Sequence, residues 1–251
     1  MCAENRKFMH CPSFKEGMAE SDQAKGVQAP PFGRPVSGPV AVLPSFGREL
    51  HTDSYSRLLD IRRSVRKFAD VPMTGEQLAF MLWSVQGIQE IRGGGVATLR
   101  TVPSGGARHP FETYVAARSV DGISAGLYRY LPAENIGGKR CALEKLGGAL
   151  DGGLVSRMLA GQSWAARASV VLFYSCVPYR AEWRYADMAH RVMLIDLGHA
   201  GQNAMLSAAA LGLGSCCMAA YDQKLCDEAL GLDGLDEYTV YAIAVGTRDA
   251  D

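Results

Sequence analysis

The residues best suited to binding chemistry form a short cationic run from 62 to 67. It places four cations and a hydroxyl within six residues, namely Arg62, Arg63, Ser64, Arg66 and Lys67. Guanidinium groups bind phosphate through paired hydrogen bonds, and a serine hydroxyl adds a further one. Arg62 and Arg66 share a face if the run is helical, because residues four apart are neighbours on a helix. The run predicts either a phosphate site or cations that stabilise the end of a helix.

A second candidate site is the loop 100–110, in which prolines restrict the backbone. The adjacent Gly105 and Gly106 permit a turn where a side chain would clash. A strand-like segment follows at 111–117, so the loop leads into the edge of a sheet. Loops of this kind bring backbone donors close to a flat or charged ligand. We expect such a cradle, with an ordinary tight turn as the alternative, and we expect His109 to face substrate.

Composition and missing motifs exclude several other classes of function. Lys+Arg and Asp+Glu both number 26, so the chain lacks the basic excess of a nucleic-acid or membrane-surface protein. The five histidines do not pair at metal-ligand spacing, so no metal site is expected. The seven cysteines contain no C-x-x-C pair, and neither a signal peptide nor a transmembrane segment is visible. We therefore expect a cytoplasmic protein with reduced thiols.

The chain divides near residue 50. Residues 1–50 are rich in proline and glycine, which interrupt any periodicity, so they predict an extended N-terminal arm. Such a segment cannot build a core alone, and its apolar side chains favour partial docking, with a partner subunit as one possible surface. Residues 51–251 predict one globular domain long enough to bury a substantial core.

Hydrophobic periodicity within 51–251 predicts both helices and strands. Helices are expected from 53 or 54 to 61, from 74 through 85, over most of 143–159, from 183 to 213 and from 222 to 230. Strands are expected at 111–117, 126–131, 168–174, 216–220 and 239–245. Without regular βαβ alternation, this mixture favours an α+β domain. The segment 200–210 is small and apolar on nearly every face, which fits the centre of a dimer.

Several motifs follow one another in a characteristic order. They are Arg-Arg-Ser-x-Arg-x-Phe at 62–68, Pro-Ser-Gly-Gly-Ala-x-x-Pro at 103–110, and Ala-Ala-Leu-Gly-Leu-Gly at 209–214 before an extended run that ends in Tyr-Asp. Because its motifs occur in this order, the chain resembles the nitroreductase-like FMN flavoproteins over roughly residues 54–248. The segments 126–130 and 197–203 resemble more narrowly the SagB-type branch, which includes the azoline oxidases of ribosomal peptide biosynthesis.

The resemblance implies a nitroreductase-like fold, with a mostly antiparallel central sheet flanked by helices. It also implies an obligate homodimer with the long helix at the interface and FMN bound at two interface sites. Reduced flavin develops negative charge at its N1–C2=O edge, so cations and amide donors stabilise it there.

The same resemblance implies which residues hold the cofactor. The predicted cofactor contacts are Arg62, Ser64 and Arg66, less favourably Arg63, then Pro103, Ser104 and Gly105 from the other subunit, then Cys217, Met218, Ala219 and Ala220, and finally Arg248. Many relatives carry Pro-x-Glu-Gly where this chain has 217–220, so backbone contacts are expected but a glutamate role is not. For the side chains of Cys217 and Met218, plain core packing is the favoured alternative.

The predicted catalytic candidates are Arg184 and Tyr185. Azoline oxidases of the SagB-type branch carry a Lys-Tyr pair here, which acts as base in ring aromatisation. Arginine almost never loses its proton, so Arg184 cannot replace that lysine. Tyr185 stays a candidate proton donor or orienting group. The substitution counts against azole formation.

We therefore expect an FMN-dependent oxidoreductase with a ping-pong mechanism. NAD(P)H would reduce the flavin, and a small electron-poor acceptor such as a nitroaromatic or quinone would take the electrons. Two alternatives stay open. One is a SagB-type dehydrogenase that oxidises a peptide azoline or another organic substrate, and the other is a non-catalytic protein that stores or sequesters FMN.

Overall fold

A seven-stranded sheet forms the centre of the protein in the computed structural model, which describes residues 21–44, 55–138, 140–147 and 150–249. The strand order is β1-β6-β5-β4-β7-β9-β8, and every pair is antiparallel. The strands are β1 Val40–Leu43, β4 Phe111–Ala117, β5 Gly126–Tyr130, β6 Cys141–Lys145, β7 Val170–Cys176, β8 Leu213–Met218 and β9 Tyr238–Thr247. A separate hairpin joins β2 Ile88–Arg92 to β3 Ala97–Arg100.

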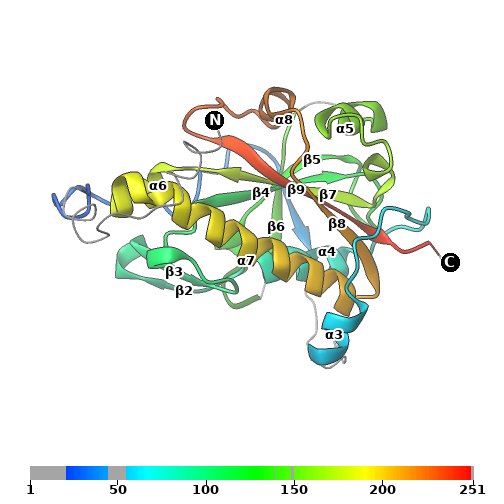
Figure 1. Ribbon diagram of the computed structural model, residues 1–251, viewed down its shortest axis with the longest axis horizontal. Coiled ribbons are helices and arrows are strands. Elements are labelled where there is room, and N and C mark those ends of the chain that lie inside the picture. The colour runs from blue at the N-terminus through cyan, green and yellow to red at the C-terminus, as the bar shows by residue number, and fades with distance from the viewer. Residues whose placement is uncertain (1–20, 45–54, 139, 148–149, 250–251) are drawn as a thin grey trace, which may run out of the picture.

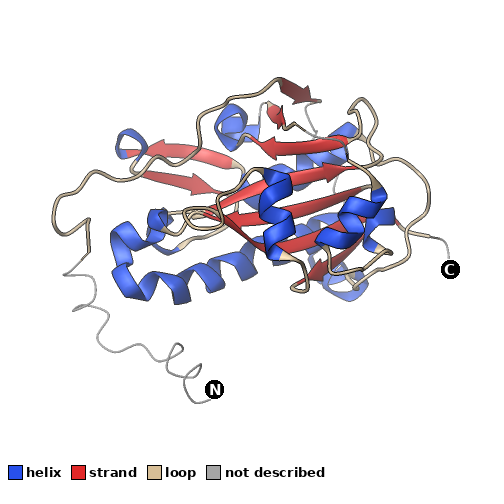
Figure 2. Ribbon diagram, turned by 90° about the horizontal axis from the view of Figure 1, so that it is seen from above, coloured by secondary structure: helices blue, strands red, loops and turns tan. Residues whose placement is uncertain are grey.

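Helices cover both faces of this sheet (Figures 1 and 2). The helices are α3 Tyr55–Ile61, α4 Gly75–Gln86, α5 Gly152–Met158, α6 Tyr179–Tyr185, α7 Ala189–Ala210 and α8 Gln223–Leu230. One apolar core joins α4 and α7 to one face of the sheet, and a second core joins α5 and α8 to the other face. The predicted α+β fold, with an antiparallel sheet flanked by helices, is confirmed.

Local signals explain the elements that the sequence predicts well. Thr74 caps α4, accepting a hydrogen bond from the Gln77 amide at 3.1 Å, while the Gln77 side chain accepts one from the Thr74 amide at 2.9 Å. Asp222 caps α8 in the same way through the amide of Leu225. All seven residues of β7 are buried, as its continuous apolar run requires. The residues proposed to cap α3 lie outside the described part of the chain.

Two predicted helices are wrong in part. The stretch 143–159 begins as strand β6, because its residues pair with β1 and β5, and it becomes helical only from α5, which Asp151 caps. The long helix predicted from 183 to 213 is interrupted after α6, where Ala186 has φ +47° and a short 3₁₀ turn leads into α7. Long-range pairing and a local chain reversal override the helical pattern at these two places.

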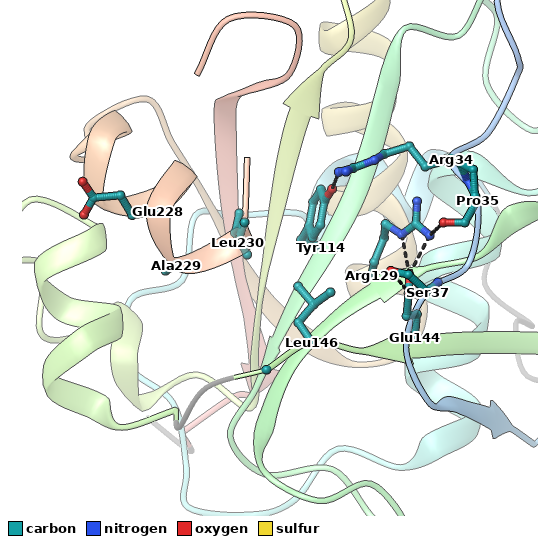
Figure 3. Close-up of a pocket in the computed structure, with 12 residues that line it drawn as sticks. Arg34, Pro35, Ser37, Tyr114, Arg129, Glu144, Leu146, Glu228, Ala229 and Leu230 are labelled. Atoms are coloured by element: carbon teal, nitrogen blue, oxygen red, sulfur yellow. Dashed lines mark hydrogen bonds and ion pairs between the residues drawn. The ribbon is translucent and has the colours of Figure 1, made fainter. Parts of the chain in front are cut away.

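The predicted arm lies on its own chain over the part that is described. Strand β1 within it pairs with β6, so the arm supplies one edge of the sheet. Just before β1, Glu144 accepts hydrogen bonds from the backbone amides of Ser37 and Gly38, both at 2.5 Å. Figure 3 shows Ser37 and Arg129 beside Glu144. Arg129 forms an ion pair with Glu144 at 2.6 Å and donates to the carbonyl of Pro35 at 2.7 Å. The arm is therefore fastened to the sheet by a buried charged pair.

Candidate functional site

The cationic run lies along the free edge of the sheet. After α3 ends at Ile61 the chain is extended, and the amide of Val65 donates to the carbonyl of Ser215 in β8 at 2.8 Å. Further along, the amide of Ala69 donates to the carbonyl of Thr247 at 3.0 Å. The helical turn considered for 62–66 is therefore wrong, because the run pairs with β8 instead. The pairing brings together parts of the chain that lie far apart in the sequence.

Three predicted cofactor residues gather beside the two cysteines of β8. Burial raises the pKa of Cys216, while Arg66 and a hydrogen bond with Ser64 act in the opposite direction. Burial also raises the pKa of Cys217, and Arg62 lies close enough to oppose that rise. Both thiols therefore stay protonated near neutral pH. This agrees with packing rather than redox chemistry as the role of these side chains.

Positive charge at this edge is not balanced by carboxylates. Among the described residues, Arg62, Arg63 and Arg66 form no ion pair. Arg248 donates to the carbonyls of Leu213 and Ile61 at 3.1 and 3.3 Å, and so holds the end of α3 against the start of β8. Cations without carboxylate partners beside Ser64, which is exposed, are a donor set that fits a phosphate group.

The end of β8 passes out of the core into solvent. Met218 is buried in the core beneath α5 and α8, whereas Ala219 and Ala220 are exposed. The carbonyl of Ala220 accepts a hydrogen bond from the side chain of Gln162 at 3.0 Å, which fixes the course of the chain. Two small exposed residues leave the backbone here accessible to a flat ligand.

The predicted loop contacts α7 of its own chain. Ser104 donates to Asp196 at 2.6 Å, and the amide of Gly105 donates to the same carboxylate at 3.1 Å. Pro103 before them is exposed. Burial raises the pKa of Asp196, and the hydrogen bonds from Ser104 and Gly105 counteract that rise. Asp196 is a functional candidate that the sequence reasoning missed, and its only signal was a carboxylate within an apolar stretch of helix.

The two loop glycines also have packing roles within one chain. A Cβ added to Gly105 would collide with Val192 of α7, and one added to Gly106 would collide with Arg184 and Tyr185 of α6. Gly106 has φ +60°, and two non-glycine residues of the loop also have positive φ. Strain of this kind concentrates at functional sites.

His109, predicted to face substrate, is instead buried. Its Nε2 lies 2.9 Å from the carbonyl of Thr98, and the side chain is surrounded by Arg100, Arg108 and Arg180. Burial, together with these cations, lowers the pKa of His109 to about 3, so the ring is neutral. A direct substrate contact does not follow from this position, and the ring supports the loop from behind.

The arm lies against α6, the helix that carries the predicted catalytic candidates. Arg184 lies over the ring of Tyr185 at 5.5 Å and donates to Gln23 at 2.7 Å. Trp183 next to them donates to the carbonyl of Val27 at 2.8 Å and accepts from the amide of Gln23 at 2.7 Å. These arm contacts leave no local pattern in the sequence, because they join residues about 160 positions apart.

The predicted residues thus form two groups in one chain. The first lies where α3 meets β8, and the second lies where α6 and the loop meet α7. Figure 1 shows α3 and α6 at opposite ends of α7, which has 22 residues. A helix of that length spans about 33 Å. One chain therefore does not bring Arg62 and Tyr185 together.

An antiparallel sheet with a long covering helix and cations along one edge agrees with an oxidoreductase of the flavoprotein class, and the family match supports that class. The chain belongs to the nitroreductase family, whose model matches residues 59–247. This agrees with the family that the motif order predicts.

Similar proteins include nitroreductases and a toxin-processing protein. A predicted nitroreductase of Methanocaldococcus jannaschii is 32% identical over 74% of this chain and 87% of its own length. The trifolitoxin-processing protein TfxB of Rhizobium leguminosarum bv. trifolii is 32% identical over 58% of this chain, but over only 39% of its own length. A nitroreductase-like structure from Ralstonia eutropha has a TM-score of 0.67 at 24% identity, covering 90% of this chain and 100% of that one.

Two kinds of feature are not found in the described residues. No helix there combines the length and the apolar character that crossing a membrane requires. The same residues contain no group of three or more histidine, cysteine, aspartate or glutamate side chains that could hold a metal ion.

Proposed function

We propose that this protein is an FMN-dependent oxidoreductase that takes electrons from NAD(P)H and passes them to a small electron-poor acceptor. The observation that carries this proposal is the pairing of the cationic run with β8. It gathers Arg62, Ser64 and Arg66 along the middle of that strand, which leads out to the exposed Ala219 and Ala220. Bound there, FMN would supply two-electron redox chemistry.

The chain's own residues would bind and orient the cofactor. Arg62 and Arg248 would neutralise the phosphate, and Arg66 would stabilise the negative charge of the reduced ring. The exposed backbone of Ala219 and Ala220 would lie along the ring, because neither residue projects bulk over it. Neutral thiols at Cys216 and Cys217 leave these cations as the charged groups next to the ring.

A first prediction concerns Arg62. Replacing it by alanine is expected to weaken FMN binding by about 1.5–3 kcal/mol, the strength of a charge-assisted hydrogen bond. Binding can be followed by the flavin absorption band during titration of protein from which the flavin has been removed. Arg140→Ala is the matched control, since Arg140 is exposed just before β6, near the opposite edge of the sheet. Equal affinities in the two variants would show that Arg62 is only a cation at a helix end.

We also propose that the protein is a homodimer joined through α7. Leu194 and Ile195 are 57% and 53% exposed, and Gly198 one turn later is also exposed. A Cβ on Gly198 would meet nothing within 4 Å, so the single chain gives no reason for a residue that weakens a helix. Two antiparallel copies of α7 would cover these side chains. They would also bring the loop group of one copy near the β8 group of the other.

This dimer gives a second prediction. Gly198→Arg is expected to shift the protein from dimer to monomer in analytical ultracentrifugation, because the new side chain would separate the helices. FMN should be lost with the dimer. Gly198→Ala is the control, which should keep the dimer and stabilise the helix by up to about 1 kcal/mol. If the Gly198→Arg variant is still a dimer, the interface does not lie on this face of α7.

The similarity to TfxB favours a second function, oxidation of a peptide by the same flavin. Arg184 stays protonated, so it cannot act as the base that a lysine would provide. Its guanidinium is also engaged in a hydrogen bond to the side chain of Gln23. Anaerobic mixing with NADH, NADPH or an azoline peptide separates the possibilities. Bleaching of the flavin by a nicotinamide supports the reductase, and bleaching by the peptide alone supports the oxidase. Bound flavin that no donor bleaches would indicate storage, and protein that binds no FMN would exclude all three functions.

A further inference from the structure

A cationic pocket lies beside the proposed flavin site. It is formed by the chain just after the Arg62–Arg66 run, the turn before β7 and the residue that follows Arg248. The pocket has a volume of about 630 Å³, and its principal lining residues are Arg66, Lys67, Phe68, Trp164, Arg167 and Asp249. Arg62 and Arg248 do not line it, so it is distinct from the group proposed for the flavin phosphate, although Arg66 adjoins both.

The charges in this pocket do not balance. Three cations face one carboxylate, and among the described residues Lys67, Arg167 and Asp249 form no ion pair. Two buried arginines, by contrast, do have carboxylate partners: Arg129 pairs with Glu144, and Arg180 pairs with Glu112. Exposed cations that converge on a hollow without such partners suit an anion of more than one charge, such as a phosphate monoester.

The aromatic wall of the pocket holds one of these cations in place. Arg66 lies over the ring of Trp164 at 5.7 Å, and Trp164 stacks on Phe68 at 6.4 Å. Phe68 is itself buried in the core, so the stack has a rigid base. A guanidinium fixed in this way loses little freedom when it binds an anion. Because Arg66 and Phe68 already pack against Trp164, the pocket suits an anion better than a stacked base.

We propose that this pocket binds the phosphate monoester that distinguishes NADPH from NADH, and so makes NADPH the preferred electron donor. The inference rests on the proposed function. A nicotinamide donor must place its ring against the flavin, which Arg66 adjoins, and the remainder of the donor must then lie on the neighbouring surface. The pocket supplies cations for the phosphate of the donor on that surface, and the carboxylate of Asp249, which also lines the pocket, opposes the binding.

Two substitutions that change affinity in opposite directions test this assignment. In FMN-loaded protein, Arg167→Gln is expected to raise KM for NADPH about tenfold and to leave KM for NADH unchanged. Asp249→Asn is expected to lower KM for NADPH about two- to fivefold, because it removes a repulsion near the surface. The flavin content of each variant, read from its absorption band, should equal that of the unmodified protein. If a substitution changes KM for NADPH and KM for NADH by the same factor, or changes neither, the proposal is overturned.

A binding measurement separates failure of this inference from failure of the proposed function. If neither nicotinamide reduces the flavin, the function is wrong, and the pocket is then judged by calorimetric titration of FMN-loaded protein with 2′,5′-ADP. Saturable binding that Arg167→Gln weakens supports a phosphate site. Absence of binding overturns it. The same titration is repeated on protein from which FMN has been removed. If 2′,5′-ADP binds only to that protein, the pocket belongs to the phosphate of the flavin itself, and the proposal is also overturned.

Discussion

Replacing Glu144 by alanine is expected to lower the free energy of unfolding by about 3–5 kcal/mol, the cost of leaving a buried charge without its partner. Arg129 and Glu144 have side chains that are only 4% and 2% exposed, and they are joined at 2.6 Å. Glu144 also accepts hydrogen bonds from the amides of Ser37 and Gly38. The substitution would therefore loosen the arm, and it would also leave the buried guanidinium of Arg129 without a carboxylate partner. Urea denaturation measures the loss of stability, and limited proteolysis of 26–38 measures the loosening.

A double variant supplies the control. Arg129→Met with Glu144→Leu removes both charges and should recover much of the lost stability, because a pair replaced by apolar residues leaves no charge unpaired. Burial alone would raise the pKa of Glu144, but the hydrogen bonds from Ser37, Arg129 and Gly38 lower it overall. The contribution of the pair is therefore complete above the ordinary glutamate pKa of about 4.3 and declines as the pH falls below it. A single variant as stable as the parent would contradict this account.

The fold was predictable where its signals are local. Strands β4, β7 and β9 carry continuous apolar or alternating runs, and α4 and α8 carry caps that the structure reproduces. Strand β6 was mistaken for helix because its identity depends on its two neighbours, one of which comes from the arm. Long-range pairing of this kind leaves little trace in a short window of sequence.

The candidate site was predictable only as a list of residues. The motif order indicates Arg62, Ser64 and Arg66, but their extended pairing with β8 depends on a contact between segments about 150 residues apart. Asp196 and Gln23 were missed for the same reason, since each acts through hydrogen bonds to residues far away in the sequence. His109 has a side chain suited to chemistry, yet the fold buries it among arginines. The type of a side chain indicates which chemistry it could do, and its burial then determines whether a ligand can reach it.

The loop provides the last prediction, which concerns Gly106. Gly106→Ala is expected to destabilise the protein by about 1–2 kcal/mol through its left-handed backbone, and by a further 1–3 kcal/mol or so through crowding. Its φ is +60°, and an added Cβ would lie 2.7 Å from the hydroxyl of Tyr185 and would collide with Arg184. Arg184 cannot easily move aside, because Gln23 holds its guanidinium over the ring of Tyr185.

Gly94→Ala isolates the crowding from the backbone strain. Gly94 has φ +63° and lies at a hairpin turn, where an added Cβ would meet nothing within 4 Å. It should therefore show only the backbone cost of about 1–2 kcal/mol. The loop is proposed to reach the flavin of the other subunit, so Gly106→Ala should also lose bound FMN, whereas Gly94→Ala should retain it. Thermal unfolding and flavin absorbance measured on both variants decide the matter, because equal flavin content would show that the loop supports α6 without contacting the cofactor.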